Sequence, residues 1–121
     1  MIKPNMLGKI LVVDDDAEVL ESTRRILDFA GYEVVTASDG ASALEIARGQ
    51  RSGSASIDVV LSDMRMPRLG GMELLRALRQ GGIEIPFVVM TAYGKIEDAV
   101  WAMRLGAVDF ILKPIRRQAI L

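Results

Sequence analysis

The chain has 121 residues, half of them hydrophobic and 26% charged, a composition that fits one globular domain and excludes a disordered or low-complexity protein. Its 15 basic and 16 acidic residues give a net charge of -1, so we expect no direct binding to nucleic acid. Histidine and cysteine are absent, which excludes imidazole and thiol catalysis, disulfides, zinc ribbons and iron–sulfur clusters, and leaves carboxylates, lysine and hydroxyl groups for chemistry.

Short apolar runs of strand length alternate along the chain with segments of helical period. The run at residues 9–13 is rich in β-branched residues and stops at three successive aspartates, as a buried parallel strand would. Gly31 ends the helical pattern that follows. In chain order, the sequence predicts a strand at 9–13, a helix at 19–30, a strand at 32–37, a helix around 43–47, a strand at 57–61, a helix around 72–78, a strand at 85–90, a helix at 96–105, a strand at 108–112 and the start of a helix at 115–121.

This alternation of strands and helices predicts an α/β fold. Right-handed crossovers between parallel strands place helices on both faces of one sheet, which makes a three-layer sandwich. In such sheets ligands bind outside the carboxyl ends of the strands, where the strand order reverses. The residues that follow the strands are therefore the candidates for function.

Polar residues follow four of the five strands, and these strand ends should meet at one edge of the sheet. Three clustered carboxylates raise one another's pKa unless a cation neutralises them, and carboxylate ligands favour Mg²⁺. A lysine ammonium and a threonine hydroxyl can bind phosphoryl oxygens, and a carboxylate can accept a phosphoryl group. Asp63 stands alone on the central strand, so it is the natural acceptor. The strand-end residues are Asp14, Asp15 and Asp16, then Asp63, Thr91 and Lys113.

These residues and their neighbours resemble the receiver domain of two-component response regulators, and the resemblance covers the whole chain, residues 1–121. Its motifs are Ile-Leu-Val-Val-Asp14-Asp15, Val-Val-Leu-Ser-Asp63-Met-Arg-Met-Pro67, Val-Met-Thr91-Ala92 and Ile-Leu-Lys113-Pro114, in the order and approximate spacing of the family. The resemblance implies a flavodoxin-like fold with strand order 2-1-3-4-5. It also implies a signalling domain rather than an enzyme, because a receiver catalyses only its own phosphorylation and dephosphorylation.

The resemblance assigns roles to the acidic residues. Asp63 would receive a phosphoryl group from the histidine of a sensor kinase. Asp15 and Asp63 would bind Mg²⁺ directly, together with the backbone carbonyl of Arg65, and Asp14 would act largely through water. The cofactor expected from this site is therefore Mg²⁺, and the partner expected is a histidine kinase.

The resemblance also implies a switch. Thr91 and Lys113 would bind phosphoryl oxygens, and the bond between Lys113 and Pro114 would be cis, a geometry that aims a neighbouring side chain. When Thr91 is recruited, the loop after the fourth strand would move and Phe110 would turn inward. Many relatives carry tyrosine at this position, so we expect Phe110 to respond through packing alone.

Two residues near these motifs are candidates to modulate the lifetime of the phosphate. Arg65 and Tyr93 lie two residues beyond Asp63 and Thr91, and the resemblance implies that side chains at these positions overhang the pocket. The alternative is that both are solvated loop residues. Asp16, by contrast, is expected to start or cap the first helix, outside the site.

The fourth predicted helix carries the sole tryptophan, Trp101. Trp101 is either a partly buried packing residue or an anchor on a partner surface. Asp98 and Arg104 would supply charged pairs across a two-fold interface, formed by this helix, the fifth strand and the fifth helix. The expected core stripe of the helix is Ile96, Ala99, Val100 and Met103, which leaves Trp101 off its middle.

The segments after Asp63 and Thr91 resemble receivers of the nitrogen-regulator type, which commonly precede an ATPase module and a DNA-binding domain. We therefore expect one receiver domain over residues 1–121 with its last helix truncated, an output domain absent from this chain, and a full-length protein that regulates transcription.

Residues 1–8 lack the apolar run of a signal peptide, and no run approaches the roughly 20 residues of a membrane span, so a cytoplasmic protein without membrane association is expected.

Three other interpretations compete with the receiver. A haloacid-dehalogenase-like phosphatase would use Asp14 as nucleophile and Asp16 as acid, but that family generally has a longer chain and a late acidic pair. A flavin-binding flavodoxin-like protein would need hydrogen-bond donors after the first strand, where three carboxylates would repel the FMN phosphate. A binding module without phosphorylation is the third, and the complete set around Asp63 argues against it.

Overall fold

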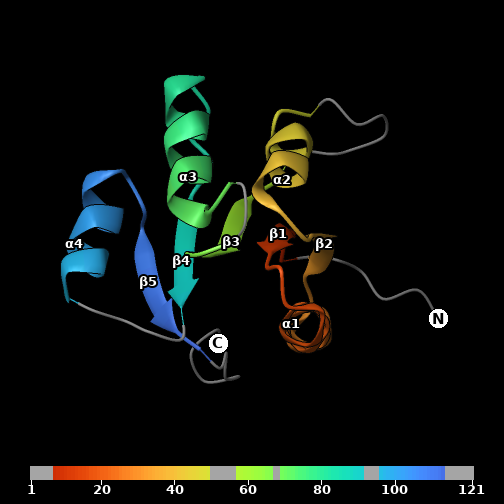
Figure 1. Ribbon diagram of the computed structural model, residues 1–121. Helices are drawn as coiled ribbons and strands as arrows, with labels where there is room; N and C mark the ends of the chain where they lie inside the picture. The colour runs from red at the N-terminus through yellow and green to blue at the C-terminus, as the bar shows by residue number, and fades with distance from the viewer. Residues whose placement is uncertain (1–6, 50–56, 67–68, 92–95, 114–121) are drawn as a thin grey trace.

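The computed structural model of the chain describes residues 7–49, 57–66, 69–91 and 96–113. Its centre is a five-stranded parallel sheet in the order β2-β1-β3-β4-β5, which confirms the predicted fold (Figure 1). The strands are β1 (Lys9–Val13), β2 (Glu33–Ala37), β3 (Val59–Asp63), β4 (Phe87–Thr91) and β5 (Asp109–Leu112). The helices are α1 (Ala17–Ala30), α2 (Gly40–Ala47), α3 (Gly71–Gln80) and α4 (Ile96–Arg104). Among the described residues, none of these helices has the length and apolar character needed to cross a membrane.

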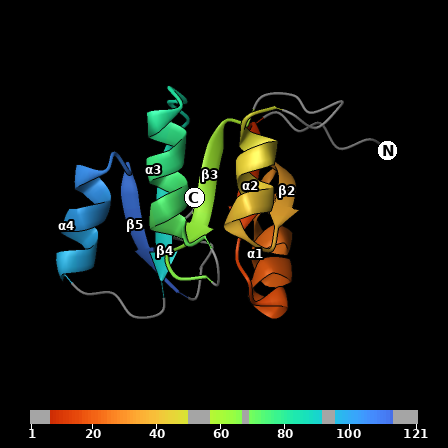
Figure 2. The same cartoon turned by 45° about the horizontal axis from the view of Figure 1, so that its top comes forward.

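Two apolar cores cover the two faces of the sheet. Leu11 and Val13 of β1 belong to the larger core, where the sheet packs against α2, α3 and α4. Ile10 and Val12 of the same strand belong to the smaller core, where Leu27 of α1 covers the sheet. Figures 1 and 2 show α2 and α3 on one side of the sheet and α1 on the other. The predicted three-layer arrangement is confirmed.

The ends of α1 follow the predicted signals. Oδ1 of Asp16 accepts hydrogen bonds from the backbone N–H groups of Glu18 and Val19, at 2.9 and 3.3 Å, which makes Asp16 the N-cap. Gly31 ends the helix at φ 108°, a conformation that glycine adopts without a steric cost. Asp16 is therefore held at the helix start, as predicted.

Two strands lie further along the chain than predicted. β3 was expected at 57–61 and spans Val59–Asp63, and β4 was expected at 85–90 and spans Phe87–Thr91. Parallel pairing continues past the apolar run, since Ser62 pairs with Val13 and Asp63 with Met90. The run of apolar residues thus ends before the hydrogen bonds between the strands do. Asp63 and Thr91 are therefore the last residues of their strands rather than the first residues of the following loops.

The predicted core stripe of α4 is wrong at two positions. Val100 and Met103 are 44% and 49% exposed, whereas Ala102 is fully buried in the larger core. Apolar residues run almost continuously from Ala99 to Met103, so the helical period in the sequence does not select one face. The position of the helix on the sheet places the small Ala102 inward.

The start of α3 lies directly against the end of β3. The N–H of Gly71 donates to the carbonyl oxygen of Met64 at 3.0 Å. A Cβ atom at residue 71 would overlap the carbonyl oxygen of Asp63 and lie 3.0 Å from Oγ of Ser62. Glycine at this position lets the helix approach the backbone of Asp63.

We expect Gly71→Ala to lower the free energy of unfolding by about 1–3 kcal/mol, because the added methyl must push α3 away from β3. Gly81→Ala is the matched control at the other end of α3. Gly81 has φ -83°, and its added Cβ would lie 3.4 Å from the carbonyl oxygen of Ala77, an ordinary van der Waals contact. Urea unfolding of both variants measures the difference, and equal stability of the two would contradict the steric argument.

Candidate functional site

Three carboxylates meet at the carboxyl edge of the sheet, as the strand order predicts. Asp14 and Asp15 follow β1, Asp63 ends β3, and the two strands are paired neighbours. Each carboxylate offers one oxygen, and these oxygens all lie within 4.8 Å of one another. Asp14 is fully buried and Asp63 is 7% exposed, whereas Asp15 faces solvent. The cluster therefore has a closed side and an open side.

Lys113 bridges two of these carboxylates from the end of β5. Its Nζ lies 2.7 Å from Oδ2 of Asp14 and 3.1 Å from Oδ1 of Asp63. The backbone N–H of Lys113 donates to the carbonyl oxygen of Thr91 at 2.8 Å, which fixes the lysine beside the end of β4. The sequence predicted contact with one carboxylate or with a phosphoryl oxygen, and the structure shows contact with two carboxylates.

Burial and charge act in opposite directions on Lys113 and Asp63. Burial lowers the pKa of Lys113, but its hydrogen bonds to Asp14 and Asp63 outweigh this and the net shift is upward, so the ammonium stays charged. Burial raises the pKa of Asp63, the hydrogen bond from Lys113 opposes this, and the charges of Asp14 and Asp15 raise it further. One ammonium therefore does not neutralise the cluster.

The donor set suits a hard divalent cation. Three carboxylates and one ammonium leave two negative charges at the site when all are ionised. Both oxygens of Asp14 have protein partners, since Oδ1 accepts from the N–H of Asp16 at 2.9 Å and Oδ2 contacts Lys113. That Asp15 and Asp63 bind the cation directly while Asp14 acts through water stays a prediction.

Of the other predicted site residues, the structure describes Thr91, Phe110 and Arg65. Thr91 is 2% exposed at the end of β4, one residue beyond the partner of Asp63 in the sheet register. Phe110 of β5 is half-buried and packs against the larger core. Arg65 lies in the loop after β3 with its side chain 70% exposed. Tyr93, Pro114 and the helix predicted at 115–121 lie outside the described residues.

The three candidate interface residues differ in exposure. Trp101 is 45% exposed and Arg104 also faces solvent, whereas the side chain of Asp98 is only 14% exposed. Nη2 of Arg65 lies 4.0 Å from Oδ2 of Asp98 in the same chain. The sequence does not predict this contact, because no pattern in it relates a loop after one strand to a helix more than 30 residues later.

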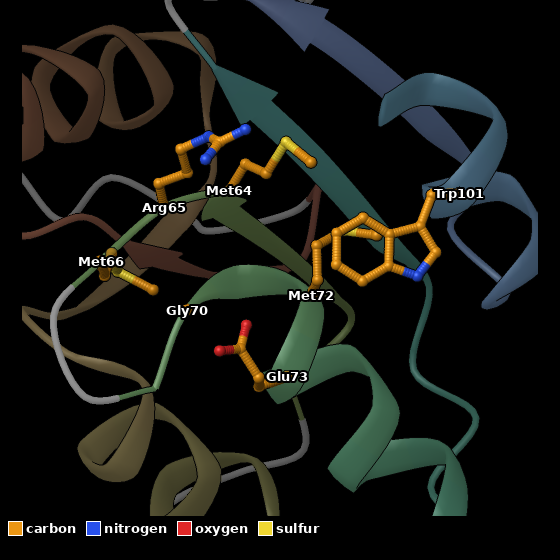
Figure 3. Close-up of a pocket in the computed structure, with 7 residues that line it drawn as sticks. All are labelled: Met64, Arg65, Met66, Gly70, Met72, Glu73 and Trp101. Carbon is orange, nitrogen blue, oxygen red and sulfur yellow. The ribbon is translucent and has the colours of Figure 1, made fainter. Parts of the chain in front are cut away.

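Trp101 also lines a pocket of about 300 Å³ between the start of α3 and α4 (Figure 3). Met64 and Met72 form part of the same pocket and are almost fully buried, and the flexible methionine side chain suits such packing. Figure 3 shows that Met72 lines this pocket from α3 and Trp101 lines it from α4.

Known proteins resemble this chain over nearly all of its length. The family model for the response regulator receiver domain matches residues 10–121. Response regulator MprA of Mycobacterium sp. (strain KMS) is 42% identical over 113 residues, which are 93% of this chain and 47% of that protein. The chain thus spans about half the length of the curated relatives that it matches.

Two solved structures are similar to this chain in both fold and sequence. A response regulator receiver domain protein from Clostridium thermocellum is 35% identical, with a TM-score of 0.81 over 93% of this chain and 87% of that one. NtrX from Brucella abortus is also 35% identical, with a TM-score of 0.81 over 93% of this chain and 25% of that one. None of these matches supports the phosphatase interpretation. With its five-stranded sheet and its acidic edge, the chain belongs to the family of response regulator receiver domains.

Proposed function

We propose that Asp63 is the phosphoacceptor of this receiver domain and that it accepts its phosphoryl group in a Mg²⁺-dependent reaction. The observation that carries the proposal is the Lys113 ammonium, which lies 2.7 Å from Asp14 and 3.1 Å from Asp63 beside a cluster of three carboxylates. Asp15, Asp63 and the backbone carbonyl of Arg65 would hold the ion, with Asp14 acting through water. When bound, Mg²⁺ would neutralise phosphoryl oxygens during transfer.

In the proposed reaction a carboxylate oxygen of Asp63 attacks the phosphorus of a phosphohistidine on a sensor kinase. A P–O bond forms at Asp63 while the P–N bond of the donor breaks, and its electron pair returns to the imidazole. Lys113 stabilises the charge on the transferred group, and the Thr91 hydroxyl donates to one of its oxygens. Beyond its own phosphorylation and dephosphorylation, the domain would catalyse no reaction.

The proposed output is a change on α4 and β5. Phosphate would recruit Thr91, and the half-buried ring of Phe110 would repack against the core. The half-length match to curated response regulators supports an output domain in the full-length protein, for which we propose a role in transcription. A cytoplasmic location and the cis bond between Lys113 and Pro114 remain predictions.

Phosphoryl uptake tests the acceptor directly. We expect acetyl phosphate and Mg²⁺ to add one phosphoryl group to the protein, as measured by intact mass, and Asp63→Asn to abolish the uptake. Asp16→Asn is the matched control from the same acidic run, because asparagine still caps a helix and Asp16 lies outside the cluster. Uptake that survives in Asp63→Asn, or that disappears in Asp16→Asn, would rule out the assignment.

The acidic cluster should cost stability when no cation is present. The pKa of Asp63 is raised from its ordinary value of 3.8, so the folded protein favours the protonated carboxyl over the ionised one. The stability gained from the protonated form is complete below pH 3.8 and is lost as the pH rises through the raised pKa. With a chelator at neutral pH we therefore expect Asp63→Asn to have a higher Tm than wild type, and the difference to vanish below pH 3.8. Differential scanning calorimetry measures both, and a wild type that is the more stable at neutral pH would contradict this.

We further propose that the phosphorylated domain forms a homodimer through α4, β5 and the following segment. The described part of this face carries a group of half-exposed apolar side chains beside the charged Arg104, and such patches commonly mark protein interfaces. They are Val100, Trp101, Met103, Val108 and Leu112, each 44–57% exposed.

We expect Met103→Lys to weaken this dimer by about tenfold or more, because it places a charge at an apolar contact. Phe29→Lys is the control, since Phe29 is 71% exposed on α1, which covers the other face of the sheet. Sedimentation equilibrium with Mg²⁺ and acetyl phosphate measures the two. Equal dimerisation of wild type and Met103→Lys would argue for a different interface.

A further inference from the structure

An ion pair joins the loop after the phosphoacceptor to the first turn of α4. Nη2 of Arg65 lies 4.0 Å from Oδ2 of Asp98, which is within ion-pair range but too long for a hydrogen bond. Arg65 lies two residues beyond Asp63, in the loop that begins where β3 ends. The pair therefore connects an output helix to the residue whose backbone carbonyl is the expected metal ligand.

Asp98 has a physical reason to hold the arginine. Its side chain is 14% exposed, and its Oδ2 is buried and accepts no hydrogen bond within the part of the chain that the structure describes. A buried carboxylate oxygen without a donor is unfavourable, because it has lost water and gained no partner. A shortening of the pair by about 1 Å would give this oxygen the charge-assisted hydrogen bond that it lacks.

The side chain of Arg65 has room for such a movement, because it lines a pocket. The pocket of about 300 Å³ separates the loop from α4, with Met64 and Arg65 lining it from the loop and Trp101 from the helix. Figure 3 shows Arg65 and Trp101 coming from opposite sides of this pocket. Between the described loop residues and α4, the ion pair is the polar link that the structure records.

We propose that Asp98 is a positioning residue for the metal site, acting through Arg65, an inference that rests on the proposed function. By holding the guanidinium, Asp98 restrains the loop so that the Arg65 carbonyl needs less ordering when a cation binds. By thermodynamic reciprocity, cation binding also favours the position of α4 in which the pair is closed. The pair is thus a route from the acidic cluster to the α4 face that does not pass through Thr91 and Phe110.

Mg²⁺ affinity of the unphosphorylated protein tests this role, by isothermal titration calorimetry and by the midpoint of a Trp101 fluorescence titration. Asp98→Asn and Arg65→Gln should each weaken Mg²⁺ binding by about two- to fivefold, the range of exposed ion pairs. Arg65→Gln keeps the backbone carbonyl. A purely electrostatic effect has a different signature, because loss of the Asp98 charge would weaken cation binding and loss of the Arg65 charge would strengthen it.

The controls separate positioning from general effects. Glu97→Gln removes the same charge from the neighbouring exposed residue of α4 and should leave Mg²⁺ affinity unchanged. The double variant of Asp98→Asn and Arg65→Gln should be no weaker than either single variant, because both remove one interaction. Exchange of the two charges, Arg65→Asp with Asp98→Arg, should restore part of the affinity.

Opposite shifts in Asp98→Asn and Arg65→Gln, additive losses in the double variant, or a loss in Glu97→Gln equal to that in Asp98→Asn would each overturn the inference. In those cases wild type would still bind Mg²⁺ and take up phosphate, so the proposed function would stand. Wild-type protein that binds no Mg²⁺ would overturn both.

Discussion

The contact of the Lys113 ammonium with Asp14 and Asp63 holds the acidic edge of this domain together. Without a cation, three carboxylates whose oxygens approach within 4.8 Å repel one another, and burial adds to the cost for Asp14 and Asp63. Lys113 lies 2.7 and 3.1 Å from two of them and offsets part of this cost. The cluster keeps a net negative charge, and its open side is at the exposed Asp15. A divalent cation and a phosphoryl group can enter from this side.

The fold supplies this geometry through backbone contacts. Pairing of β3 with β1 and β4 carries Asp63 to the same edge as Asp14, and pairing of β4 with β5 brings Lys113 beside Thr91. Gly71 then allows α3 to lie against the carbonyl of Asp63. Main-chain hydrogen bonds in the centre of a sheet are rigid, so the position of Asp63 depends little on loop conformation, whereas the proposed carbonyl ligand of Arg65 depends on the loop after β3. The loops at this edge are the parts that would change conformation on phosphorylation.

Much of the fold and the acidic cluster could be predicted from the sequence, because parallel β/α topology alone brings Asp14 and Asp63 to one edge. The strand ends were displaced by one or two residues, since hydrogen bonding continues into polar residues that a hydrophobic pattern excludes. The face of α4 was predicted wrongly around Met103, because a helix with apolar residues all around it has no distinct stripe. The contact of Arg65 with Asp98 depends on tertiary packing that no local pattern encodes.

The central claim is that the acidic cluster and Lys113 make Asp63 the carboxylate that carries phosphate. Borohydride reduction of the phosphorylated protein converts an aspartyl phosphate to homoserine, and tandem mass spectrometry of its peptides then identifies the modified residue. The account predicts homoserine at position 63, in an amount that depends on Mg²⁺, with Asp14 and Asp15 unmodified. Homoserine at position 14 or 15, or at position 63 in equal amount without the metal, would contradict it.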